Sequence, residues 1–507
     1  MTNNIDNHEQ NHEQEKVFGV ETVSVEKQQE VLNKYENDTV AEIQGKEIHK
    51  KIVDVIVLIA TLYVLYTCAF GSQMTSVAPA QHELAPIYET ANIAVDHNQL
   101  VMETMKRVAM KHSMRCLLHE KPYAGVNGSG KHDNWSITTD NGVNLLDPGE
   151  TPNENIQFLL VLACILKAVD THAALLRQSA ADVGNDHRLG ANEAPPAIIS
   201  VFLGEQLEDV VTQLVETGEA TSVKQGGKLV TGVSTLPDVQ KDATDRNRTS
   251  PFAFTSNKFE FRSVGSADSV ADPNTTLNAM VAEAFCEAAD KLEAADNFEM
   301  CVHDLIKEYL TKHQRIIFNG NGYSEEWVAE AARRGLPNIP TTIEAAAALT
   351  SDSTVELFEK FGIFTRTELA SREEIIYETY AKAINIEALT MIDMAGKQII
   401  PAVIRYAREL ADTIVVLKQV GADSSVEEEV LGKVNVRLRA MQDALTELIA
   451  TDKKARQIEQ GKEKAFYYKD HIVGIMKKLR EPADELEMLV DKEFWPIPTY
   501  AELMFEV

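Results

Sequence analysis

The stretch KPYAGVNGSGKHDNWS, residues 121–136, combines a glycine-rich turn with a run of alternating polarity. Gly128 and Gly130 permit a tight turn in which the backbone approaches a ligand closely. The alternation predicts a strand over residues 126–137, and the same pattern predicts another strand over residues 252–264. The two stretches favour a sheet as the part of the fold that carries the chemistry.

The strand predicted over residues 126–137 has different side chains on its two faces. His132, Asn134 and Ser136 are expected on one face, and Asp133 and Trp135 on the other, because successive side chains in a strand alternate. One face therefore offers an imidazole that can bind metal and two hydrogen-bonding groups. A turn followed by a structural histidine explains the same pattern.

The second strand, FAFTSNKFEFR at residues 252–262, places charges against aromatics. Lys258, Glu260 and Arg262 are expected on one face. Phe259 and Phe261 are expected to pack into the core from the other. The charged face is either solvated or part of a site that holds metal and phosphate together, since a carboxylate between two cations suits both ligands.

Three further segments concentrate charge, glycine or proline. They are VAPAQHELAP at residues 77–86, GNDHRLGANEAPP at residues 184–196, and the arginine pair at Arg246 and Arg248. Guanidinium groups can hold phosphate or carboxylate through two hydrogen bonds. The surrounding residues 216–250 are polar and contain glycine, which predicts an ordered loop over a site or a mobile insertion.

Helical signals occupy much of the remaining sequence. Thr151-Pro152-Asn153-Glu154 predicts a capping box before a helix over residues 156–179, and residues 371–374 and 425–428 predict two more. Residues 310–507 are predicted as a helical bundle. Pro401 is expected to kink or divide the run 375–420. Gly421 is expected to end it.

The composition of the chain argues against several classes of partner and site. The formal net charge of −29 disfavours nucleic acid as a partner and also disfavours an anionic membrane surface. The five scattered cysteines indicate reduced thiols in the cytoplasm rather than a zinc site or a disulfide framework. The uncharged run Val55–Phe70 is either a membrane anchor or a buried strand or helix, and we favour the second because it is short for a span.

The glycine-rich segment resembles the ATP-region motif of glutamine synthetases. The phrases VAPAQHELAP, GVNLLDPG, GNDHRLGANEAPPA, NRTSPFAF and KFEFR resemble the type III subfamily and occur in its order over residues 77–507. The resemblance implies an α+β fold, in which a curved antiparallel sheet with flanking helices precedes a helical C-terminal domain. The expected divisions are a polar leader at 1–52, an apolar segment at 53–76, a partial catalytic domain at 77–305 and a helical domain at 306–507.

The resemblance also implies a reaction and its partners. Such enzymes make glutamine from glutamate and ammonia by way of γ-glutamyl phosphate, with ATP and Mg2+ or Mn2+, and they assemble as homo-oligomeric rings. The implied roles, by position in the motifs, are metal binding for Glu83, His132 and Glu260; glutamate binding for Asn127, Gly128 and Arg188; nucleotide binding for Asn134, Ser136 and Lys258; and catalysis for Glu193, Arg248 and Arg262.

Departures from the family pattern leave alternatives open. Ser76 stands where the family has a metal-binding glutamate, and neither the upstream E-x-E pair nor the small N-terminal β domain is recognisable in residues 1–76. The alternatives are a non-catalytic regulatory or assembly subunit that keeps nucleotide binding, a membrane-tethered variant, and a γ-glutamyl ligase that uses another amine.

Overall fold

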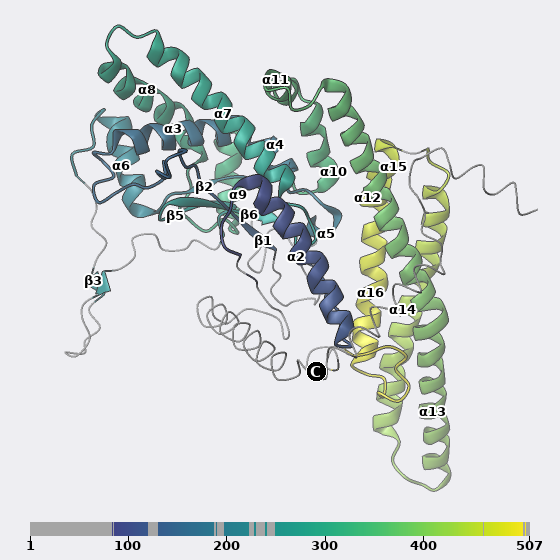
Figure 1. Ribbon diagram of the computed structural model, residues 1–507. Coiled ribbons are helices and arrows are strands. Elements are labelled where there is room, and N and C mark those ends of the chain that lie inside the picture. Colours follow the sequence, from purple (N-terminus) through teal and green to yellow (C-terminus); the bar gives the residue numbers. More distant parts are fainter. Residues whose placement is uncertain are drawn as a thin grey trace, which may run out of the picture. The chain divides into compact units, whose positions relative to one another are not determined.

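The computed structural model describes residues 84, 86–119, 130–186, 189, 197–222, 228–229, 239–240, 249–459, 461–499 and 502 (Figure 1). Nearly all of them belong to one compact unit that contains Ile87–Val507. The apolar run Val55–Phe70 lies outside these ranges. Within them, no helix is both long and apolar enough to cross a membrane.

The two alternating stretches lie in neighbouring strands of one sheet. The strand order is β1 (Lys131–Trp135), β6 (Lys258–Val264), β5 (Phe252–Thr255) and β2 (Val201–Phe202). Strands β1 and β5 run antiparallel to β6, but β2 runs parallel to β5. The sheet is therefore mixed rather than wholly antiparallel. A separate pair consists of β3 (Lys228–Leu229) and β4 (Val239–Gln240).

The single strand predicted over residues 252–264 is a hairpin. Thr255 pairs with Lys258, so the chain turns back at Ser256 and Asn257. Ser256 has a φ of 60°, in the left-handed region that non-glycine residues seldom occupy. The turn contains no glycine, which is why the sequence pattern did not reveal it. Alternation within β6 itself is as predicted.

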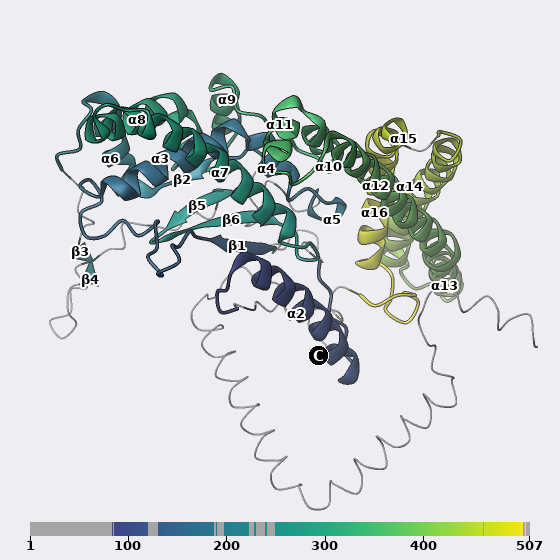
Figure 2. The same ribbon diagram turned by 45° about the horizontal axis from the view of Figure 1, so that its top comes forward.

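Helices pack on both sides of the sheet. They are α2 (Ala91–Lys111), α3 (Ile156–Thr171), α4 (Ala173–Gln178), α5 (Val183–Asp186), α6 (Gly204–Glu216), α7 (Ala271–Glu293) and α8 (Phe298–His313). The central helix α3 packs against α7 and α8. Figure 2 shows α3 and α7 over one face of the sheet and α2 on the opposite side.

Two details of the predicted helix over residues 156–179 are wrong. The side chain of Asn155, rather than Thr151, accepts the capping hydrogen bond, from Phe158 N at 3.1 Å. The helix also breaks at His172, between α3 and α4. His172 lies in the core and its Nε2 is 2.8 Å from Glu283 Oε2 on α7, a contact that sequence spacing cannot reveal.

Shorter helices lead into a set of long ones. The shorter elements are η2 (Gln314–Ile316), α9 (Glu325–Arg333), α10 (Thr342–Ala345), η3 (Ala346–Thr350) and α11 (Asp352–Lys360). The long helices and their interruptions are α12 (Arg366–Met394), η4 (Ala395–Ile399), α13 (Ile400–Gln419), α14 (Ser425–Ala455), α15 (Lys462–Tyr467), η5 (Tyr468–Ile472) and α16 (Val473–Glu487). Elements η4 and η5 are π-helical turns.

The ends of the long helices test the capping predictions. Pro401 stands in the first turn of α13, directly after the π turn, so it divides the run as predicted. Gly421 follows the end of α13 with a φ of 75°, also as predicted. The predicted capping box at residues 371–374 is wrong, because α12 begins earlier and Thr365 and Glu368 form the box. The predicted capping box at residues 425–428 is also wrong. The N-cap of α14 is Ser424, and its side chain donates to Glu428 Oε1 at 2.8 Å instead of accepting from the backbone.

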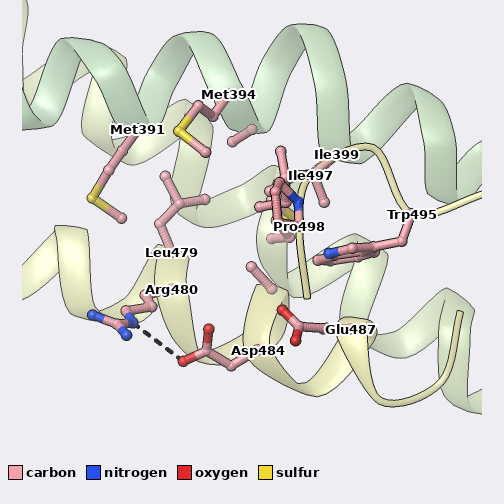
Figure 3. Close-up of a pocket in the computed structure, with 13 residues that line it drawn as sticks. Met391, Met394, Ile399, Leu479, Arg480, Asp484, Glu487, Trp495, Ile497 and Pro498 are labelled. Atoms are coloured by element: carbon pink, nitrogen blue, oxygen red, sulfur yellow. Dashed lines mark hydrogen bonds and ion pairs between the residues drawn. The ribbon is translucent and has the colours of Figure 1, made fainter. Parts of the chain in front are cut away.

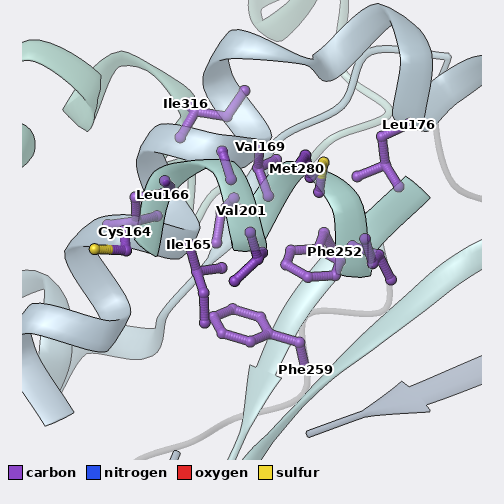
Figure 4. Packing of buried hydrophobic residues seen from close by; sticks show 14 of the residues in the cluster. Cys164, Ile165, Leu166, Val169, Leu176, Val201, Phe252, Phe259, Met280 and Ile316 are labelled. Atoms are coloured by element: carbon purple, nitrogen blue, oxygen red, sulfur yellow. The ribbon is translucent and has the colours of Figure 1, made fainter. Parts of the chain in front are cut away.

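Two apolar cores result from this packing. The first gathers buried residues between Trp135 and Leu369, around the sheet and α3. Phe252 and Phe259 stack there with ring centroids 4.6 Å apart, as Figure 4 shows beside Ile165 and Met280. The second joins the long helices, mainly over residues 343–495. Burial of the phenylalanine face of β5 and β6 in the first core fixes which face of the sheet is left for polar groups.

Candidate active site

Strand β1 presents its polar residues as the alternation predicts. Trp135 is buried, whereas the side chain of His132 is 43% exposed and Asn134 is exposed. The pairing of β1 with β6 shifts register between Lys131 and Asp133, which places His132 at an irregular position. Asn134 Nδ2 donates to the backbone oxygen of His132 at 3.4 Å. The irregularity and this bond together position the imidazole at the edge of the sheet.

Strand β6 holds a buried charged pair. Glu260 is 3% and Arg262 4% exposed, so the solvated alternative for this face is wrong. Arg262 donates to Glu260 Oε2 from Nη2 at 2.9 Å and from Nε at 3.2 Å. Thr255 Oγ1 donates to the other carboxylate oxygen at 3.3 Å. Both oxygens of Glu260 therefore have donors, which a buried carboxylate requires.

His132 and Glu260 come together across the two strands. Asn134 pairs with Glu260 in the ladder, and His132 Nδ1 lies 3.8 Å from Glu260 Oε2. Two atoms that share one divalent ion at bond lengths of about 2.0–2.3 Å lie roughly 3–4 Å apart. An imidazole and a carboxylate thus fit a hard divalent cation here. The described ranges contain no group of three or more His, Cys, Asp or Glu side chains arranged for a metal.

The residues expected on the nucleotide side lie near the hairpin turn. Ser136 Oγ donates to Asn144 Oδ1 at 2.9 Å and to the backbone oxygen of Asn257 at 3.3 Å. Lys258 is half-buried opposite Thr255. Asn144 Nδ2 donates to the same Asn257 oxygen at 2.9 Å. Ser136 and Lys258 are therefore brought to one end of the β1–β6 pair, with Asn144 as a partner that the sequence did not indicate.

Two residues at the start of the GNDHRLGANEAPP segment anchor it to different elements. Asn185 is fully buried, and its Nδ2 donates to Ser263 O on β6 at 2.6 Å. Asp186 accepts from Thr342 N and from Thr342 Oγ1 at 3.0 and 2.8 Å. This segment therefore begins beside the strand of Glu260 and Arg262. Sequence reasoning missed these anchors, since an Asn-Asp pair in a polar loop gives no sign of burial.

Asp133 is another residue that the sequence did not single out. Burial raises the pKa of its carboxyl to about 6, against the hydrogen bond from Asn274 and the charge of Lys131. Asn274 Nδ2 donates to Asp133 Oδ2 at 3.1 Å. Lys131 Nζ donates to the backbone oxygen of Asp268 and contacts Met102 Sδ at 3.1 Å. These contacts join β1 to α2 and α7.

Six of the expected site residues lie outside the described ranges: Glu83, Asn127, Gly128, Arg188, Glu193 and Arg248. Six lie inside them. Of these, His132, Glu260 and Arg262 form one cluster, Ser136 and Lys258 lie at the adjoining hairpin, and Asn134 packs beside His132. The four described cysteines carry free thiols: Cys116, Cys164, Cys286 and Cys301.

Comparison with known protein families gives two matches. The model described as "Glutamine synthetase, catalytic domain" matches residues 5–198. The model described as "Glutamine synthetase C-terminal domain" matches residues 301–418. The first match begins upstream of residue 77, where the resemblance described above becomes recognisable in the sequence.

Several curated proteins are similar over most of this chain. A glutamine synthetase of Butyrivibrio fibrisolvens is 48% identical over 437 residues, which cover 85% of this chain and 62% of that protein. A type-3 glutamine synthetase of Dictyostelium discoideum is 41% identical, with 85% and 60% covered. A glutamine synthetase of Bacteroides fragilis is 42% identical over the same shares. The chain thus spans about 60% of the length of these relatives.

Proposed function

Because this chain belongs to the glutamine synthetase family, we propose that it catalyses the ATP-dependent ligation of ammonia to the γ-carboxylate of glutamate. The observation that supports the proposal is the cluster of His132, Glu260 and Arg262 on adjacent strands, with an imidazole nitrogen 3.8 Å from a buried carboxylate oxygen. The arrangement provides two ligands for a divalent cation and one fixed guanidinium. Phosphoryl transfer depends on such groups far more than on covalent chemistry.

In this proposal His132 and Glu260 would hold Mg2+ or Mn2+ beside the phosphates. A bound cation offsets the negative charge of the ATP phosphates and of the acyl phosphate. Glu260 is ready for that role because burial and strand geometry fix its carboxylate. Its hydrogen bonds from Arg262 and Thr255 orient it.

Arg262 acts on the moving phosphoryl group. The γ-phosphoryl of ATP passes to a γ-carboxylate oxygen of glutamate, which leaves ADP and γ-glutamyl phosphate. Ammonia then attacks the acyl carbon, and phosphate leaves. Arg262 donates N–H bonds to the phosphoryl oxygens in both steps, and Arg248 does the same.

The remaining roles follow the family motifs. Asn127, Gly128 and Arg188 bind glutamate, and Glu193 receives a proton from ammonium and closes the site. Glu83 supplies a ligand to a further metal. Asn134, Ser136 and Lys258 contact the nucleotide, and the position of Ser136 and Lys258 at one end of the β1–β6 pair supports a common ligand for these two.

The assembly and compartment are also part of the proposal. We expect a homo-oligomer, in keeping with the family, with glutamate, ammonia and ATP as its small-molecule partners. Free thiols in the four described cysteines fit a reducing compartment such as the cytoplasm.

The test is γ-glutamyl transfer by the purified chain with Mn2+, ADP, arsenate, glutamine and hydroxylamine. The amide nitrogen of glutamine leaves as ammonia, and γ-glutamyl hydroxamate forms. We expect hydroxamate from the unmodified chain and at least about a 100-fold loss in Glu260→Ala, which removes a charge-stabilising ligand.

Ser263→Ala is the matched control. Ser263 lies on the same strand and is 1% exposed, and among the described residues its Oγ has no hydrogen-bond partner. This variant should keep its transfer activity. A folded chain that binds ATP one to one but yields no hydroxamate would overturn the catalytic proposal and favour the regulatory alternative.

A further inference from the structure

A second, apolar site opens among the long helices. A cavity of about 230 Å³ lies between α12, η4, α14, α16 and residues 495–498 (Figure 3). Met391, Met394 and Met441 line it together with Leu479 and Ile497. Methionine side chains adapt their shape to varied apolar ligands. None of the six described residues proposed for glutamine synthesis lines this cavity. An inference about the cavity is therefore independent of the proposed function.

Trp495 provides a polar atom that has nothing to bind. Its side chain is 8% exposed, and among the described residues its Nε1–H has no hydrogen-bond partner. Figure 3 shows the indole reaching from the main chain into the cavity with its nitrogen at the inner end. A buried donor left without an acceptor is costly, and native structures seldom keep one without a reason. An acceptor from a ligand would remove that cost.

The wall of the cavity contains an irregular helical turn. The π turn η4 interrupts the helix between Met394 and Ile400, and its Ala395 and Ile399 both line the cavity. Single π turns within α-helices are rare and recur at functional sites.

The rim of the cavity limits the charge of a ligand. Arg480 and Asp484 lie there and pair with each other at 3.2 Å, as the dashed line in Figure 3 marks. A charged ligand would have to leave water for an apolar interior, and an anion would also meet the carboxylate of Glu487, which lines the cavity as well. An uncharged ligand avoids that desolvation. For size, an engineered cavity of about 150 Å³ in another protein binds benzene, so this larger one admits two fused rings.

We propose that this cavity binds an uncharged, mainly apolar molecule of one or two rings whose acceptor atom pairs with Trp495 Nε1–H. The apolar body contacts the methionines and Leu479. The acceptor completes the only bond that the indole can donate. Specificity between ligands of equal shape then depends on the presence and place of the acceptor.

The experiment compares two probes of the same shape by ligand-observed NMR titration of the full chain at pH 8. Quinoline is uncharged at this pH and carries a nitrogen acceptor, while naphthalene carries none. We expect both to bind. Trp495→Phe should weaken quinoline about three- to ten-fold, the ratio expected for one hydrogen bond, and should leave naphthalene unchanged.

Trp327→Phe is the matched control. Trp327 is 1% exposed and its Nε1 likewise has no partner among the described residues, but it lies in the first core, stacked on Phe318 at 3.7 Å. This variant should leave quinoline binding unchanged. Ala483→Phe, at the lining, should abolish binding of both probes while the circular dichroism spectrum is retained.

Three results would overturn the proposal. The first is no binding of quinoline to the unmodified chain. The second is an equal effect of Trp495→Phe on the two probes. The third is undiminished binding by a folded Ala483→Phe variant.

Discussion

Two arginine–carboxylate pairs in the described part of the chain, each with a buried arginine, have very different surroundings. In the Arg262–Glu260 pair on β6, the guanidinium gives two hydrogen bonds to one carboxylate oxygen. In the Arg177–Asp186 pair between α4 and α5, Nη2 is 3.8 Å from the carboxylate, and Nε donates instead to Ile339 O at 3.1 Å. Among the described residues, Nη1 and Nη2 of Arg177 have no hydrogen-bond partner.

The two pairs differ in their role. The Arg262–Glu260 pair belongs to the candidate active site, whereas the Arg177–Asp186 pair holds structural elements together. Glu260 faces His132, a ligand-type nitrogen that is partly exposed, so a cation from solvent has two donor atoms to reach. Asp186 faces Thr342 at the start of α10 and is held by the backbone there. Burial of an ion pair therefore does not by itself indicate function. Function is indicated by the group that lies beside the carboxylate, which is an imidazole for Glu260 and a threonine for Asp186.

Asp186→Ala should give the largest loss of stability, about 3–5 kcal/mol, because it leaves Arg177 buried without its carboxylate and removes the acceptor of Thr342. Urea unfolding would measure it. The double variant Arg177→Met/Asp186→Asn removes both charges and keeps an acceptor for Thr342, so it should recover most of the loss. If Asp186→Ala lowered the free energy of unfolding by less than about 1 kcal/mol, the pair would not hold these structural elements together.

Arg262→Met should cost about 2–3 kcal/mol, because the buried Glu260 loses its charged donors. Here Mn2+ should recover part of the loss, since a cation between Glu260 and His132 can replace the guanidinium. Thermal unfolding with and without Mn2+ measures this. Arg177→Met serves as the control and should gain nothing from Mn2+ beyond the unmodified chain. If Mn2+ stabilised Arg262→Met and Arg177→Met equally, the two pairs would not differ in metal binding.

The free energy of unfolding should depend on pH through the titration of the Asp186 carboxyl. Burial raises its pKa to about 6 despite the Thr342 bonds and Arg177, above the value of 3.8 for the free group. The folded state thus binds the proton more tightly than the unfolded state. This contribution is fully present below pH 3.8 and is lost as pH rises through 6.

Between pH 5 and 7 this group should lower the free energy of unfolding by about 1–1.5 kcal/mol, from the linkage relation. Asp186→Asn, which cannot titrate, should flatten the profile over that interval. Asp133 has a similarly raised pKa, so Asp133→Asn should flatten it as well, and the two effects should add. A profile unchanged by Asp186→Asn would mean that the carboxyl is solvated.

The smallest expected effects concern the hydroxyl donors. Thr342→Val removes a bond of 2.8 Å to Asp186, and Thr255→Val removes one of 3.3 Å to Glu260. We expect about 1 kcal/mol for the first and about 0.5 kcal/mol for the second, since the longer bond is weaker. Urea unfolding of both variants in parallel would check the order. In the transfer assay, only Thr255→Val should change the dependence on Mn2+.

Sequence patterns predicted much of this structure where the physics is local. Alternation correctly divided β1 and β6 into faces, since the side-chain period of a strand is independent of its neighbours. Pro401 and Gly421 correctly marked helix boundaries because each constrains its own backbone. The hairpin at Ser256 was missed because its turn contains no glycine. The caps at Asn155 and Thr365 were mispredicted because several residues near each boundary had suitable side chains and packing decided among them.

The sequence by itself determined that Lys258, Glu260 and Arg262 share a face and that Phe259 and Phe261 share the other. Only the tertiary structure decided that the charged face is buried, that Asn134 pairs with Glu260, and that His132 therefore lies 3.8 Å from its carboxylate. The anchoring of Asn185 on β6 and of Asp186 on Thr342 was decided in the same way. The reason is physical: alternation is fixed by bond geometry within one strand, whereas burial and register depend on which distant segments pack together.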